Sequence, residues 1–127
     1  MNNTKVILST LWIVVLFNMI FADILSFITP GSFEAVNAMQ VSQSLLLVYA
    51  VLLEIPIIMV ILSRVLKRGV NRWANIIASI ITIAFVIGGG STYLHYIFLA
   101  TIEVVLMLLI MWIAWKWEYN KEMLNLE

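Results

Sequence analysis

The feature that most constrains this chain is an apolar run at 44–63 that four basic residues follow directly. The run reads SLLLVYAVLLEIPIIMVILS. As a helix it would be about 30 Å long, which matches the thickness of the hydrocarbon core of a bilayer. Arg64, Lys67, Arg68 and Arg72 come next in the chain. The run therefore predicts a membrane-spanning helix with one basic end.

The rest of the chain is just as apolar. Hydrophobic residues make up 64% of the 127 and charged residues 11%, too apolar a balance for one soluble core. Further apolar runs at about 6–28, 73–88 and 96–117 give four predicted spans, followed by a polar tail at 118–127. Asp23 and the lack of a small-residue cleavage site favour a retained first span over a cleaved signal. We expect one all-α transmembrane domain over 1–127, an up-down-up-down bundle.

Basic residues set the expected orientation. All seven Lys and Arg residues fall on one side of a four-span topology, and the loops at 29–43 and 89–95 carry none. The positive-inside rule then places both termini in the cytoplasm. The formal net charge of zero gives no nucleic-acid surface. The chain has no cysteine and one histidine, so we expect no disulfide, no metal site and no cofactor.

Three carboxyl groups lie inside predicted spans. Counted from the outer ends, Asp23, Glu54 and Glu103 come out about 7, 15 and 10 Å deep, with Asn18 near the depth of Glu54. Tyr96 shares a helix face with Glu103, seven residues on. No Lys or Arg lies at this depth, so we expect at least some of these acids to be protonated. Together they predict a polar pocket, although each acid alone could instead be hydrogen-bonded glue between helices.

Two features bear on helix packing. Pro56 removes a helical hydrogen bond beside Glu54 and predicts a kink, which would serve packing or gating equally well. One stripe on the third span carries small or polar residues at i, i+4, i+7, i+11 and i+14. It predicts a face against which neighbouring helices pack closely. The members of this stripe are Asn75, Ser79, Thr82, Val86 and Gly89.

Several short segments recur together in a known pattern. They are ADILS at 22–26, EIP at 54–56 with Met59, LSRVL at 62–66, NRWANI at 71–76, IE at 102–103 and WIAWKW at 112–117. In this order they resemble an uncharacterised family of small bacterial membrane proteins, known only as a domain of unknown function. The resemblance implies four helices in the bacterial inner membrane, in a broadly DoxX-like style. It implies no activity and no catalytic residue.

Three functions are compatible with these residues. The first is binding or transport of a small amphipathic or cationic ligand at the carboxylate-lined pocket, where transport by so small a bundle would require a homodimer. The second is an intramembrane acid–base enzyme acting on a lipid-like substrate, which ranks lower because the chain shows no nucleophile motif or cofactor box. The third is a structural or accessory membrane subunit whose acids only specify packing.

The basic segment has its own expected role. Anionic headgroups attract each basic residue near the membrane surface by about 1 kcal/mol. We expect Arg64, Lys67, Arg68 and Arg72 to contact lipid phosphates and to set the topology, with Trp73 at headgroup depth. If the second helix continues past Ser63, the first three of these share one helix face.

Overall fold

The computed structural model describes residues 3–89 and 93–117, which form five helices and no strand. They are α1 (Asn3–Phe27), α2 (Ser32–Met39), α3 (Gln43–Val65), α4 (Arg68–Gly88) and α5 (Leu94–Trp115). The predicted polar tail at 118–127 lies outside the described residues.

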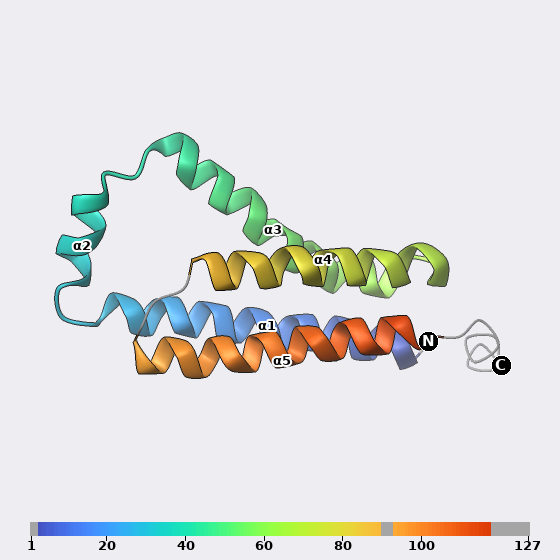
Figure 1. Ribbon diagram of the computed structural model, residues 1–127. Coiled ribbons are helices and arrows are strands. Elements are labelled where there is room, and N and C mark those ends of the chain that lie inside the picture. The colour runs from blue at the N-terminus through green and yellow to red at the C-terminus, as the bar shows by residue number, and fades with distance from the viewer. Residues whose placement is uncertain (1–2, 90–92, 118–127) are drawn as a thin grey trace.

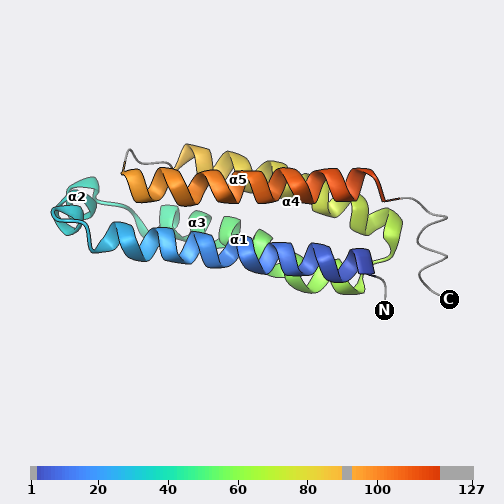
Figure 2. The same ribbon diagram turned by 90° about the horizontal axis from the view of Figure 1, so that it is seen from below.

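The four long helices form an antiparallel bundle in chain order (Figures 1 and 2). Helix α1 packs against α3 and α5, and α4 packs against the same two helices from the other side. Each of the four is long and apolar enough to cross a membrane. The predicted all-α fold with four membrane-spanning helices is confirmed.

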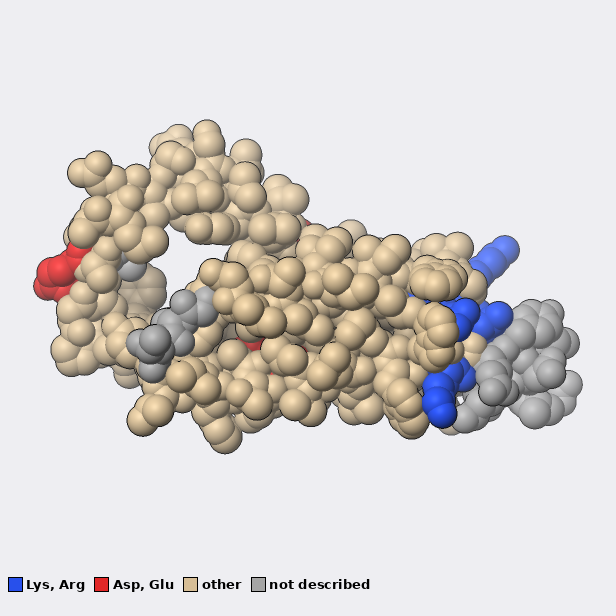
Figure 3. Space-filling model, in the orientation of Figure 1, with Lys and Arg blue, Asp and Glu red and all other residues tan. Residues whose placement is uncertain are grey.

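The basic segment at 64–72 differs from the expected loop. Arg64 lies in the last turn of α3, and α4 begins at Arg68, so only Leu66 and Lys67 connect the two helices. Because α3 ends at Val65, the expected shared helix face of Arg64, Lys67 and Arg68 does not form. We call this end of the bundle, where the described Lys and Arg side chains gather in Figure 3, the basic end.

The segment predicted as a loop at 29–43 contains a helix, α2, at the opposite end of the bundle (Figure 1). Gly31 precedes it with φ of 84°, a left-handed conformation that glycine adopts without steric cost. Gln40 ends it, also left-handed, with φ of 48°. Ser42 then caps α3, because its hydroxyl accepts a hydrogen bond from the Leu45 amide at 3.1 Å. Hydropathy alone did not reveal α2, which is only eight residues long.

The core lies between the helices over most of the bundle length. Leu8, Trp12 and Val15 of α1 are fully buried, as are Met107 and Ile110 of α5. On α4 the predicted packing stripe is buried as expected at Asn75, Ser79, Thr82 and Val86. The exception is Gly89, which is exposed because α4 ends at Gly88.

Helix α3 covers the bundle unevenly. Its second half lies against α4, whereas its first half leans away from the other helices (Figure 1). Pro56 lies between the two halves and is buried. Proline has no N–H to donate to the carbonyl of Leu52 and its ring crowds that group, which accounts for a bend here. The lean leaves space between α3 and the bundle at the α2 end.

Candidate ligand site

A cavity lies at the α2 end, where α3 leans away (Figure 3). Its volume is about 740 Å³, within the range of ordinary small-molecule sites. All five helices contribute to its wall. The lining residues are Met19, Ala22, Asp23, Met39, Tyr49, Leu53, Phe85, Val86, Gly88, Gly89, Tyr96 and Glu103. We call this space the acid cavity.

Two of the three predicted acids lie on the wall of the acid cavity. Glu103 of α5 is only 2% exposed, and Asp23 of α1 lines the same space. The structure gives the Glu103 carboxyl no hydrogen-bond or ion-pair partner among residues 3–89 and 93–117. Tyr96 also lines the cavity, and its hydroxyl donates a hydrogen bond to the carbonyl oxygen of Val86 at 3.1 Å. The side chains of the wall are therefore apolar except for two carboxyl groups and two phenols, those of Tyr49 and Tyr96.

The other two predicted members lie elsewhere. Glu54 of α3 is exposed and does not line the cavity, because the neighbouring Leu53 occupies the cavity side of the helix. A step of one residue turns a helix by about 100°, so Glu54 points to another face. Asn18 donates its side-chain amide to the Val14 carbonyl of its own helix at 2.9 Å. The structure thus brings two of the three predicted acids to the acid cavity, and Glu54 lies outside it.

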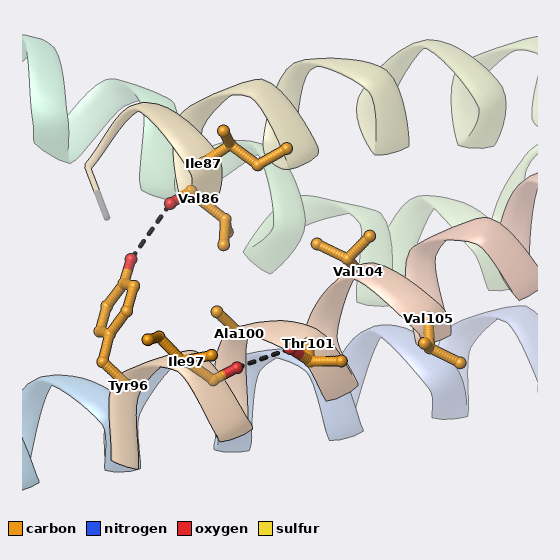
Figure 4. Close-up of a pocket in the computed structure, with 8 residues that line it drawn as sticks. All are labelled: Val86, Ile87, Tyr96, Ile97, Ala100, Thr101, Val104 and Val105. Atoms are coloured by element: carbon orange, nitrogen blue, oxygen red, sulfur yellow. Dashed lines mark hydrogen bonds between the residues drawn. The ribbon is translucent and has the colours of Figure 1, made fainter. Parts of the chain in front are cut away.

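An apolar groove adjoins the acid cavity between α4 and α5 (Figure 4). It has a volume of about 320 Å³ and shares Val86 and Tyr96 with the cavity. Thr101 adds little polarity here, because its hydroxyl donates to the Ile97 carbonyl at 2.7 Å. The Tyr96–Val86 hydrogen bond lies where the groove meets the acid cavity. The aliphatic surface of the groove is thus continuous with the carboxyl-lined cavity.

The α2 end also holds a polar contact between α1 and α5. The hydroxyl of Ser26 lies 3.2 Å from Nε2 of His95. The His95 ring stacks on Tyr93 with centroids 5.5 Å apart and an angle of 15° between the planes. These contacts fit a histidine at a helix end better than a metal ligand. No group of three or more His, Cys, Asp and Glu side chains within the described residues could hold a metal ion.

Nearer the basic end, a buried set of side chains that we call the amide cluster joins three helices. It consists of Trp12, Ser63, Asn71 and Asn75, and all four side chains are fully buried. Trp12 Nε1 donates to Asn75 Oδ1 at 2.8 Å, and the Ser63 hydroxyl donates to the same oxygen at 3.2 Å. Asn75 Nδ2 donates to the backbone oxygen of Asn71 at 2.9 Å and to its Oδ1 at 2.6 Å. The sequence analysis did not predict a structural role for Trp12, Ser63 or Asn71. The spacing of Asn71 and Asn75, four residues apart around the start of the third predicted span, was a signal for a buried polar cluster.

Two arginines of the basic segment bind the end of α5. Arg72 donates from Nε to the Ala114 carbonyl at 3.0 Å and from Nη2 to the Trp115 carbonyl at 2.9 Å. Arg68 Nη1 donates to the Trp117 carbonyl at 2.6 Å. The last carbonyls of a helix lack partners within it and carry partial negative charge, so a cation there stabilises the helix end. Contact of these residues and of Trp73 with lipid phosphates stays a prediction.

The Arg72 guanidinium also lies against two indole rings. Its central carbon is 5.4 Å from the Trp73 ring centroid and 5.1 Å from that of Trp115. The two rings meet edge to face at 6.2 Å. Stacking on aromatic faces together with two hydrogen bonds suits the planar guanidinium and not an ammonium group.

Two buried hydroxyls lie on α4 beyond the amide cluster. Ser79 is fully buried and Thr82 is 2% exposed. Neither hydroxyl has a hydrogen-bond partner within the part of the chain that the structure describes. Both belong to the packing stripe, so their small size is what brings the neighbouring helices close.

The geometry defines the class of protein: four apolar helices in a bundle make this a multi-pass membrane protein. By family, the chain belongs to DUF6326, a family of unknown function, and the match covers residues 1–124. The predicted membership of an uncharacterised family of small four-helix proteins is confirmed. No curated protein and no solved structure matches the chain, so the DoxX-like style stays a prediction.

Proposed function

We propose that this membrane protein binds a small amphipathic ligand in the acid cavity, with a cationic or hydrogen-bond-donating head held by Asp23 and Glu103. The observation that carries the proposal is the placement of both carboxyl groups on the wall of one 740 Å³ space that is otherwise mainly apolar. An ionisable group within a membrane span is costly, and such groups commonly mark ligand or ion sites.

The chemistry of the wall favours this kind of ligand. Carboxyl oxygens accept hydrogen bonds and attract positive charge, and among the described residues no Lys or Arg lines the cavity to pair with them. Met19, Leu53 and Phe85 supply the surface that an apolar body would contact. The adjoining aliphatic groove offers room for a further apolar part of the ligand.

The test uses tetraphenylphosphonium, a lipophilic cation, and tetraphenylborate, an anion of matched shape. Binding to protein in nanodiscs is measured by equilibrium dialysis against empty nanodiscs. We expect the protein to increase binding of the cation and not of the anion. E103Q and D23N should each weaken cation binding by about tenfold, which corresponds to about 1.4 kcal/mol.

E54Q is the matched control, because it removes a carboxyl group of a span that lies outside the cavity. It should bind the cation as the unaltered protein does. Equal loss in E54Q and E103Q, or the absence of protein-dependent cation binding, would contradict the proposal. The latter outcome would favour an accessory subunit whose acids only specify helix packing.

Proton-coupled transport and acid–base catalysis would both use the same two carboxyl groups. Transport requires access to the cavity from both sides of the membrane, and the amide cluster fills the bundle between the cavity and the basic end. Binding is therefore the function that this arrangement supports directly.

A further inference from the structure

We infer that α3 forms the interface with a second copy of this chain, through a surface centred on Glu54. This inference concerns a different surface from the acid cavity and does not depend on the proposed ligand. Helix α3 is the least covered of the four long helices. Only 11% of its most apolar stretch is buried, against 22% for α5 and 33% for α1 and for α4.

Exposed residues follow α3 at alternating steps of four and three. The apolar members are between 47% and 65% exposed, and Glu54 is the polar member near the centre. This spacing places them in one line along the helix and matches the seam of a left-handed helix pair. We call them the α3 stripe: Leu47, Val51, Glu54, Ile58, Ile61 and Val65.

Contact with lipid is favourable for the apolar members of the stripe but not for the carboxyl group of Glu54. The carboxyl group lies midway between Gln43 and Val65, the two ends of the helix, where a membrane has no water to bond it. Among the described residues of the spans, Glu54 is the one acid that neither lines the acid cavity nor is buried. Polar side chains in spans normally find partners on neighbouring helices.

A second copy supplies a partner of the right chemistry at the right depth. The described Lys and Arg side chains gather at the basic end, so the described residues present no cation at the level of Glu54 (Figure 3). Copies of one membrane protein share a topology, so a twofold axis along the membrane normal makes the two α3 helices parallel. Glu54 then faces Glu54 of the other copy. Two carboxyl groups hydrogen-bond directly when at least one carries a proton, and one polar residue in a seam fixes its register.

The absence of cysteine from the chain makes a direct test possible. Single cysteines are placed on the stripe, as I58C and I61C, and on other exposed faces, as I77C on α4 and V105C on α5. Each full-length variant is reconstituted at high lipid-to-protein ratio and oxidised with copper phenanthroline. We expect covalent dimers from the two stripe positions, and at most one tenth as much from I77C and V105C.

Replacements of Glu54 in the I61C background test its role in the pair. E54Q retains hydrogen bonding and should leave the yield of covalent dimer unchanged, whereas E54L should lower it about tenfold at equal lipid dilution. Equal dimer yield from I61C and V105C would overturn the proposal. Failure of I58C and I61C to cross-link would also overturn it. The comparison of stripe and control positions does not depend on whether E54L folds.

Discussion

Replacement of Asn75 by alanine tests whether the amide cluster holds the bundle together. The change removes the acceptor of two hydrogen bonds from other helices, donated by Trp12 at 2.8 Å and by Ser63 at 3.2 Å. Hydrogen bonds between helices in a membrane contribute about 0.6 kcal/mol on average and up to about 1.7 kcal/mol. Loss of both should therefore lower the free energy of unfolding by about 1–3 kcal/mol.

The measurement is reversible unfolding in mixed micelles with increasing SDS, followed by helical circular dichroism. N18A is the matched control, because Asn18 bonds only its own helix and its loss should change stability by no more than about 0.5 kcal/mol. The double variant W12F/N75A isolates the bond between helices. If N75A costs no more than N18A, or if the effects of W12F and N75A simply add, the amide cluster does not act as we describe.

Three further predictions concern the basic end and α4. R72K should lower the free energy of unfolding by about 1–2 kcal/mol and speed hydrogen exchange in the last turn of α5, because lysine lacks the planar guanidinium group. The control K67Q should do neither. Equal hydrogen exchange in the two variants would refute the role of Arg72 at the end of α5. T82V should leave the free energy of unfolding unchanged or raise it by up to about 1 kcal/mol, since it removes a buried hydroxyl without a partner in the described structure. A marked loss of stability in SDS unfolding would contradict this and would show that the Thr82 hydroxyl has a hydrogen-bond partner. Neutralising Arg64, Lys67 and Arg68 together should weaken or invert the orientation of the protein in the membrane. Labelling of the termini in intact cells measures this orientation, and an unchanged orientation would refute the topological role of these residues.

The sequence predicted the fold well because hydropathy reports span length and loop position directly. It also identified Asp23, Tyr96 and Glu103, which the structure brings to one cavity. It could not predict that Glu54 lies outside the cavity. Sequence position gives the depth of a residue in the membrane, whereas the direction in which its side chain points depends on how the helix rotates and leans. The lean of α3 at Pro56 is such a tertiary property.

The basic segment shows a second limit of sequence reasoning. Charge at a membrane boundary suggested contacts with lipid, yet Arg72 binds carbonyl groups at the end of α5 and Arg68 binds the Trp117 carbonyl just beyond it. Those partners lie more than 40 residues away in the chain, and only the packing of α4 against α5 brings them close. Local patterns carry no information about such pairs.

The short connection between α3 and α4 has a consequence for how the chain is made. Only Leu66 and Lys67 separate the helices, and Asn71 Nδ2 closes the turn by donating to the Ser63 carbonyl at 2.8 Å and to the Leu66 carbonyl at 3.2 Å. These partners are eight and five residues away, so the turn can form as soon as they leave the ribosome, before α5 is synthesised. The two helices would then enter the membrane together as a helical hairpin, and the arginines at its tip would be in position when the final helix arrives.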